Sequence, residues 1–323
     1  MKTRMLGRTG FNVSEIGYGA WGIGGSQWVG AGERTSLAAL QKAIELGINF
    51  VDTALAYGDG NSERLVGRAV RDADAREIYV ATKVPPKNRL WPARPGIGLD
   101  DVFPQDYIVA SAEQSLKNLG VDAIDLLQLH VWNPEWIGRE EWRRAFEDLK
   151  SSGKVRAVGI SINDHQPDSA LEIIGTGLID TVQVIYNIFD QTPEQKLFPL
   201  CREKKIGVIA RVPLDEGALT GTITPDTVFP EGDFRNFYFR DDRKKQVAGR
   251  VNSLITELEY PADQLPELAL RFCISNPAVS TVIPGMRTIE NVAKNSTVPG
   301  QGPLPAKVLA ILKRHAWDRN FYM

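Results

Sequence analysis

Short apolar segments alternate along this chain with longer segments that have the periodicity of amphipathic helices. Several of the short segments are continuous apolar runs, such as INFV, IYVAT and GVIA, rather than alternating ones. Continuous runs are typical of strands that are covered on both faces, as in a parallel sheet. The segments that predict strands cover residues 16–18, 49–52, 78–82, 123–129, 155–161, 181–184, 207–210 and 279–283.

The helical segments between these runs end close to a glycine, the usual residue just beyond a helix C-terminus. Helices are predicted over residues 33–46, 105–119, 142–152 and 192–205. The repeated order of helix, glycine and apolar strand is the connection of a parallel α/β fold. Eight such units favour a (β/α)8 barrel, the TIM barrel, over a doubly wound sheet. Ahead of the first strand, residues 4–6 and 12–14 flank GRTG and predict a short N-terminal β-hairpin.

Composition and charge leave the predicted fold class unchanged and limit the possible partners of the protein. The chain has 323 residues, of which 43% are hydrophobic and 24% are charged, and its net charge is −2. We expect residues 1–323 to form a single domain, and the small net charge argues against nucleic acid or an anionic membrane as a partner. No apolar run reaches the roughly 18 residues of a membrane span, and no secretory leader is visible. Cys201 and Cys273 lack the spacing of metal ligands, so we expect reduced thiols in a cytoplasmic protein that holds no metal. The sequence leaves the oligomeric state open.

Polar or ionisable side chains follow the predicted strands, at the end where the active sites of such barrels lie. Asp52 ends the second strand and Tyr57 follows it, whereas Lys83 and His130 follow the third and fourth strands. Later strands bring further polar side chains to the same end of the barrel, among them Ser161, Asn163, Gln183, Arg211 and Arg287.

The first four of these residues suggest a definite chemistry. A tyrosine hydroxyl has a pKa of about 10, and a neighbouring ammonium such as that of Lys83 lowers it. A carboxylate keeps the lysine charged and oriented, and a histidine can hydrogen-bond to a carbonyl oxygen. Such a set handles the proton that is exchanged when a carbonyl and an alcohol interconvert. It supplies no hydride, so a cofactor is required.

Six motifs then relate the chain to a known family. The stretches VDTALAYGDGNSERLVG, YVATKV, DLLQLHVWNP, VRAVGISINDH, VQVIYN and STVIPGMRTIENVAKN occur in this order over nearly the whole chain. On these motifs the sequence resembles the aldo-keto reductases, and most closely the bacterial branch related to the β subunits of potassium channels. The resemblance implies an NADP(H)-dependent oxidoreductase that reduces aldehydes or ketones to alcohols. It also implies that Tyr57 is the general acid, that Lys83 and Asp52 tune it, and that His130 holds the substrate carbonyl.

The same resemblance assigns residues to cofactor and substrate. The cofactor residues that it implies are Gly19, Ala20, Trp21, Asp52, Ser161, Asn163, Gln183, Arg211, Val212, Pro213, Leu214, Gly217, Gly285, Met286, Arg287, Asn291 and Asn295. Thr222 stands where some relatives have a diphosphate-binding lysine, and Arg235 is a candidate replacement for it. The substrate residues are Trp21, Tyr57, Trp91, His130 and Trp132, with Trp28 as a further wall. The alternative for Trp91 and Trp132 is that they only pack loops. Arg211 stands where many relatives have an aromatic residue, and it either stacks on the nicotinamide or lies near the diphosphate.

The last loop supports a phosphorylated cofactor on physical grounds as well. Gly285 lets the backbone approach a phosphate, and Thr288 begins a helix whose N-terminus attracts anions. Arg287 offers a planar, permanently charged group that fits a phosphate monoester. The loop therefore predicts NADP(H) rather than NAD(H).

Three other interpretations compete with a carbonyl reductase. Gly17, Gly19 and Gly22 spell GxGxxG, but more glycines follow and no helix can begin before about Glu33, which argues against a Rossmann fold. A cofactor-binding regulatory subunit with slow turnover would keep the same four residues. A sugar or polyol dehydrogenase that works in the oxidative direction would keep them too, because the chemistry is reversible.

Overall fold

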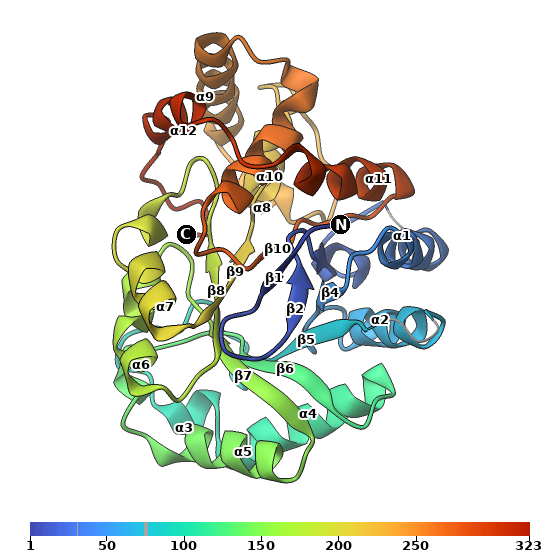
Figure 1. The fold of residues 1–323 in the computed structure, drawn as a ribbon, viewed down its shortest axis with the longest axis vertical. Coiled ribbons are helices and arrows are strands. Elements are labelled where there is room, and N and C mark those ends of the chain that lie inside the picture. The colour runs from blue at the N-terminus through green and yellow to red at the C-terminus, as the bar shows by residue number, and fades with distance from the viewer. Residues whose placement is uncertain (31, 74–76) are drawn as a thin grey trace.

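The computed structural model describes residues 1–30, 32–73 and 77–323. In this part of the chain, a parallel sheet of eight strands curves into a ring that helices surround (Figure 1). Sheet neighbours are consecutive in sequence from β3 to β10. Parallel bridges of Ile16 with Val282 and of Gly19 with Gly285 join the first strand of the ring to the last. These bridges close the predicted (β/α)8 barrel, which is thereby confirmed.

The strands lie close to their predicted positions. They are β1 (Thr3–Met5), β2 (Asn12–Ser14), β3 (Tyr18–Gly19), β4 (Phe50–Asp52), β5 (Tyr79–Val84), β6 (Ile124–Leu129), β7 (Val155–Ser161), β8 (Thr181–Ile185), β9 (Gly207–Arg211) and β10 (Thr281–Val282). The first barrel strand begins two residues later than predicted. There the backbone of Gly19 passes the last strand so closely that a Cβ would lie 2.7 Å from the carbonyl oxygen of Ile283.

The helices pack around the outside of the ring. They are α1 (Glu33–Glu45), α2 (Asn61–Arg71), α3 (Leu99–Val102), α4 (Gln105–Leu119), α5 (Glu140–Ser151), α6 (Leu171–Thr176), α7 (Leu197–Lys204), α8 (Arg235–Tyr238), α9 (Arg243–Leu258), α10 (Leu265–Ser275), α11 (Ile289–Thr297) and α12 (Ala306–Lys313). Gly120 ends α4 in the left-handed conformation, as predicted, and its N–H bonds to the carbonyl of Leu116. The helix predicted over residues 192–205 is shorter, because Lys196 leaves the helical region just before α7.

The N-terminal hairpin of β1 and β2 closes one end of the barrel. It is antiparallel, with Arg4 opposite Val13, and in Figure 1 it lies across the centre of the ring. Side chains from the hairpin region pack with inward-facing strand residues in one buried cluster of Leu6, Phe11, Val13, Phe50, Tyr79, Ala81, Leu126, Ala157, Ile209 and Ile283. This end of the barrel is therefore a packed apolar core that leaves no room for a ligand.

The opposite end of the barrel is polar. Alternate residues of a strand share one face, so the residues two positions beyond this core also point inward. On β4, β5, β6 and β9 they are Asp52, Lys83, Gln128 and Arg211. The strand pattern thus places the predicted chemistry at the carboxyl ends of the strands. Among the helices of the described residues, none is long and apolar enough to cross a bilayer.

Candidate active site

Lys83 lies at the centre of the polar end and is completely buried. Its Nζ donates hydrogen bonds to Asp52 Oδ2 and to the carbonyl oxygen of Thr53, both at 2.7 Å. The hydroxyl of Tyr57 lies 3.4 Å from the same Nζ. Asp52 ends β4, Tyr57 follows in the next loop and Lys83 is on the neighbouring strand β5, so the pairing of two adjacent strands brings the three groups together.

The charges of this group are set by burial and by mutual contact. Burial lowers the pKa of Lys83, but Asp52 and Tyr57 raise it by more, so the net shift is upward and the lysine stays charged. Burial raises the pKa of Tyr57, and Lys83 only partly offsets this. The expectation that the ammonium leaves the Tyr57 pKa below its ordinary value is therefore wrong. At neutral pH the Tyr57 side chain is a phenol that can donate its proton.

His130 lies beside Tyr57. Their ring centroids are 5.7 Å apart, and the indole of Trp91 lies 5.6 Å from the imidazole. Burial, together with the charges of Lys83 and Arg211, holds the pKa of His130 well below its ordinary value, so the imidazole is neutral. Its Nδ1 is buried and has no hydrogen-bond partner among the described residues. The structure thus brings all four predicted catalytic residues together.

Gln183 and Gln128 extend the polar end inside the barrel. Gln183, predicted to bind the cofactor carboxamide, donates from Nε2 to Asp52 Oδ1 at 2.7 Å and so fixes the second oxygen of that carboxylate. Gln128 is fully buried, and neither atom of its amide has a partner among the described residues. Neither Gln128 nor the Thr53 carbonyl was predicted from the sequence. The inward alternation along β6 is the signal that identifies the glutamine, whereas a backbone carbonyl leaves no trace in a sequence.

Asn163 and Trp132 have partners within the protein. The amide of Asn163 donates to the carbonyl of Ala93 at 3.1 Å and accepts from the N–H of Ala93 at 3.3 Å. Trp132 has no exposed surface, and its indole donates to the carbonyl of Ser169 at 3.2 Å. It packs edge-on against Trp136 and Trp142. This placement matches the packing alternative for Trp132, whereas Trp91 is 46% exposed next to His130.

Trp21 borders the mouth of the barrel on another side. Its ring lies 6.2 Å from that of Tyr57, 5.4 Å from that of Trp28 and 5.1 Å from that of Phe234. The backbone N–H of Phe234 donates to the carbonyl of Gln27 at 2.8 Å, which ties the segment before α8 to the loop that carries Trp28. Phe234 was not predicted, because nothing in the sequence places residue 234 beside residue 21.

Arg211, the last residue of β9, lies at the same barrel mouth as the tetrad of Asp52, Tyr57, Lys83 and His130. Its Nη2 donates to Asp164 Oδ1 at 2.8 Å and to the carbonyl of Ile162 at 3.0 Å. Its charge influences the pKa of both Tyr57 and His130, so the guanidinium is within electrostatic reach of the catalytic residues.

Two further arginines flank the indole of Trp28. The guanidinium of Arg235 lies 5.1 Å from its ring and that of Arg287 lies 5.4 Å from it. Arg287 Nη1 donates to the carbonyl of Val29 at 2.8 Å. Arg235 is held by Asp233 through two bonds of 2.8 Å. Arg235 therefore has a carboxylate partner, whereas Arg287 forms no ion pair in the part of the chain that the structure describes and bonds to a neutral carbonyl.

The last loop has the geometry expected of an anion site. The side chain of Thr288 caps α11 by accepting from the N–H of Asn291 at 3.2 Å. A Cβ built on Gly285 or on Gly217 would meet nothing within 4 Å, so there is open space beside both backbones. Met286 is buried, and its carbonyl accepts from the hydroxyl of Tyr18 at 2.5 Å. The space beside these glycines and the N-terminus of α11 could accommodate an anionic group of a cofactor.

Most of the remaining predicted cofactor residues follow the carboxyl ends of the strands, whereas Asn295 lies further along α11. Gly19 and Ala20 are at the end of β3, Ser161 ends β7, residues 212–214 follow β9, and Asn295 is buried within α11. In the described residues, no group of three or more His, Cys, Asp or Glu side chains is placed to hold a metal ion. Cys201 and Cys273 are buried free thiols.

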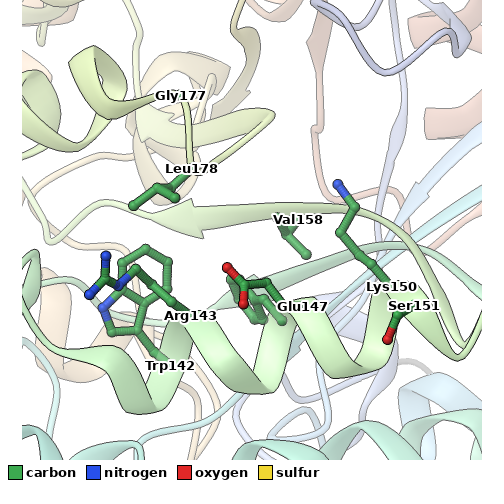
Figure 2. Close-up of a pocket in the computed structure, with 9 residues that line it drawn as sticks. Trp142, Arg143, Glu147, Lys150, Ser151, Val158, Gly177 and Leu178 are labelled. Carbon is green, nitrogen blue, oxygen red and sulfur yellow. The ribbon is translucent and has the colours of Figure 1, made fainter.

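A groove of about 500 Å³ lies on the outside of the barrel rather than at its mouth. Figure 2 shows α5 along one side of it, with Leu178 from the segment after α6 opposite and Val158 of β7 between them. Its apolar lining includes Trp142 and Phe146, and none of the four catalytic candidates reaches it. The chemistry of the site is therefore at the carboxyl ends of the strands.

Comparison with known proteins is consistent with this geometry. The model of the Aldo/keto reductase family matches residues 15–316. The chain belongs to the aldo/keto reductase family. It is therefore an oxidoreductase of carbonyl compounds in a family that uses nicotinamide cofactors, which confirms the resemblance seen in the sequence.

Individual relatives span nearly the whole of this family member. Aldo-keto reductase YhdN of Bacillus subtilis is 30% identical over 93% of this chain and 89% of its own. The NADH-specific methylglyoxal reductase of Escherichia coli is 31% identical over 91% of this chain and 92% of its own. A probable voltage-gated potassium channel subunit beta of Oryza sativa is 30% identical over 91% of this chain and 90% of its own. The solved structure of aldo-keto reductase AKR11C1 from Bacillus halodurans in its holo form is 31% identical, covers 98% of this chain and 96% of its own, and has a TM-score of 0.76.

Proposed function

We propose that this protein is an NADP(H)-dependent aldo-keto reductase that reduces aldehydes or ketones to alcohols, with Tyr57 as the general acid. The observation that carries the proposal is the buried Lys83, which contacts both Asp52 and the hydroxyl of Tyr57. We further propose that the whole chain is one cytoplasmic domain.

The proton chemistry follows from the charge states of these groups. The phenol of Tyr57 gives its proton to the carbonyl oxygen of the substrate, and the Lys83 ammonium stabilises the phenolate that forms. Asp52 keeps the lysine charged and is itself held by Gln183. The neutral imidazole of His130 donates a hydrogen bond that orients the carbonyl. The bound nicotinamide cofactor would supply the hydride.

The substrate surface is aromatic. Trp21 and Trp91 flank Tyr57 and His130, so we propose that they bind the body of the substrate. Walls of this kind suit carbonyl compounds with apolar or sugar-like bodies. The indole of Trp28 packs against that of Trp21, and the guanidinium of Arg287 lies near the Trp28 ring.

The cofactor is proposed to bind across the mouth, from Arg211 on the nicotinamide side to Arg287 and α11 on the adenosine side. Gly19, Ala20, Ser161 and Gln183 would contact the nicotinamide end, and Gly217, Gly285, Asn291 and Asn295 the remainder. Because a relative of similar identity is named as NADH-specific, the preference for NADP(H) rests on Arg287. Its guanidinium has no carboxylate partner in the described residues and fits the 2′-phosphate.

Substitution of Arg287 tests this preference. Arg287→Ala is expected to weaken NADPH binding by about 10- to 100-fold, the range of a lost charge-assisted contact, and to leave NADH binding nearly unchanged. The dissociation constants of both cofactors provide the measurement. An unaltered ratio of the two constants would contradict the assignment of Arg287.

Steady-state consumption of NADPH over a panel of aldehydes at neutral pH tests the function itself. Turnover is expected for the wild type, and Tyr57→Phe should reduce it by about 10²- to 10⁴-fold, the usual contribution of a general acid. The variant should bind NADPH as the wild type does, because the hydroxyl acts mainly in the transition state. Tight NADPH binding with negligible turnover of every aldehyde would indicate a regulatory subunit, and turnover only from alcohol and NADP⁺ would indicate a dehydrogenase.

A further inference from the structure

A second group of buried ionisable side chains lies at the barrel mouth, and the proposed mechanism does not use it. Asp215 and Glu216 follow β9 and are 1% and 8% exposed. Both have left-handed backbone conformations, with φ of 51° and 54°. Such conformations are unfavourable for residues other than glycine and persist only where the surroundings impose them. Consecutive buried carboxylates in such a loop need partners of their own.

The end of the chain supplies these partners. Arg319 forms an ion pair with Asp215, and the hydroxyl of Tyr322 donates to Glu216 Oε1 at 2.6 Å. The tail is anchored independently of these two contacts, because Arg243 Nη1 donates to the carbonyl of Phe321 at 2.7 Å. Residues about 100 positions apart in the sequence thus form a single buried cluster.

Arg211 links this cluster to the catalytic residues. Asp164 and the carbonyl of Ile162 hold Nη2, whereas Nε is buried and has no partner among the described residues. Its charge influences the pKa of Glu216 and of Tyr322, just as it influences that of Tyr57. The ring of Tyr322 also lies 5.9 Å from that of His165, the residue that follows Asp164, so the tail packs against the segment that holds the guanidinium.

The Tyr322 hydroxyl is the donor that satisfies the buried carboxylate of Glu216. While that hydroxyl donates to Glu216, the buried carboxylate is satisfied and Arg211 stays with Asp164. Without it, the carboxylate lacks a donor, and a buried acceptor left unsatisfied is costly. Arg211 Nε is buried without a partner among the described residues, and the charge of Arg211 already acts on Glu216, so an ionised Glu216 without its donor would draw the guanidinium toward itself.

We propose that Tyr322 and Glu216 are positioning residues for Arg211, so that the C-terminal tail sets the strength of cofactor binding on the nicotinamide side. This inference rests on the proposed function, because it requires that Arg211 faces the cofactor. The tail acts through Arg211 and not by touching the cofactor itself.

Tyr322→Phe removes only the hydroxyl and provides the first test. NADPH binding is followed by quenching of tryptophan fluorescence at a pH above about 8, where Glu216 is ionised. It is expected to weaken by about 3- to 10-fold, as for the loss of one hydrogen bond. The matched control is Tyr238→Phe, which removes the hydroxyl that donates to the neighbouring Asp215 at 2.9 Å. The control should leave NADPH binding unchanged, even if both variants melt at a lower temperature.

Two double variants separate positioning from a loss of structure. Tyr322→Phe combined with Glu216→Gln should regain most of the affinity, because the uncharged amide no longer attracts Arg211. In an Arg211→Ala background, Tyr322→Phe should have no further effect. A full additional loss in that background, no loss in the single variant, or no recovery with Glu216→Gln would each overturn the inference. Failure of the wild type to bind NADPH would instead overturn the proposed function.

Discussion

At the barrel mouth, one charged group is centred on Lys83, which contacts Asp52 and Tyr57. A second group contains Arg211, which bonds to Asp164, together with the buried carboxylates and their partners in the C-terminal tail. The first group comes from adjacent strands and the loop between them, and it balances one ammonium against one carboxylate. The second draws on the loops after β7 and β9 and on the C-terminal tail, where carboxylates outnumber the guanidinium groups. Strand pairing therefore fixes the tetrad locally, whereas the second group depends on how distant segments dock.

The charge imbalance has a direct consequence. Burial raises the pKa of Glu216 to about 7, and Asp215 adds to this, while the Tyr322 hydroxyl and Arg211 act in the opposite direction. Glu216 can thus exist in either protonation state near neutral pH. In the tetrad, by contrast, Lys83 is held charged and His130 neutral. The catalytic side has fixed charges, and the tail side can change its charge.

The largest expected effect is that of breaking the ion pair on the catalytic side. Lys83→Met leaves Asp52 buried without its cation, which should cost about 3–5 kcal/mol of unfolding free energy and abolish measurable turnover. Asp52→Asn combined with Lys83→Met should regain much of that stability but none of the activity. Urea unfolding and NADPH consumption provide the two measurements. A double variant as unstable as Lys83→Met would contradict this account. So would NADPH consumption by Lys83→Met with the pH dependence of the wild type.

A smaller effect is expected on the tail side, and it depends on pH. The pKa of Glu216 is raised in the folded protein, so between its unfolded value of 4.5 and about 7 the folded state holds the proton more tightly. Stability from this group is therefore present at low pH and is lost as the pH rises through 7, by about 3 kcal/mol in total. Glu216→Gln has no such proton to lose. As the pH rises from 5 to 8, the unfolding free energy of the wild type should therefore fall relative to that of the variant. Urea unfolding at both values measures the difference, and parallel pH dependences would refute the assignment.

The smallest expected effect compares two tryptophans on the catalytic side. Trp132→Phe loses one indole hydrogen bond, which should cost about 1 kcal/mol of stability and leave the KM for aldehydes unchanged. Trp91→Phe at the exposed position beside His130 should instead raise that KM without destabilising the protein. Aldehyde kinetics and thermal unfolding distinguish the two variants. A raised KM for Trp132→Phe would return Trp132 to the substrate surface.

Much of the barrel and the catalytic group could be predicted from the sequence. Continuous apolar runs located the strands, and the glycine after α4 located its end because the left-handed cap requires it. Asp52, Lys83 and His130 were found because the residues that end parallel strands must meet at one edge. These inferences succeed because each rests on a local regularity: the alternation of a strand, the cap of a helix or the residue that follows a strand.

Only the tertiary structure decided which segments far apart in the sequence contact one another. The contact of Tyr322 with Glu216, the bond from Arg211 to Asp164 and the place of Phe234 beside Trp21 join loops with no periodic pattern. The direction of the Tyr57 pKa also reversed, because a sequence names the neighbouring charge but not the depth of burial that opposes it. Sequence thus determined the regular scaffold and the chemical groups it carries. Docking, which depends on side-chain packing in three dimensions, determined their surroundings.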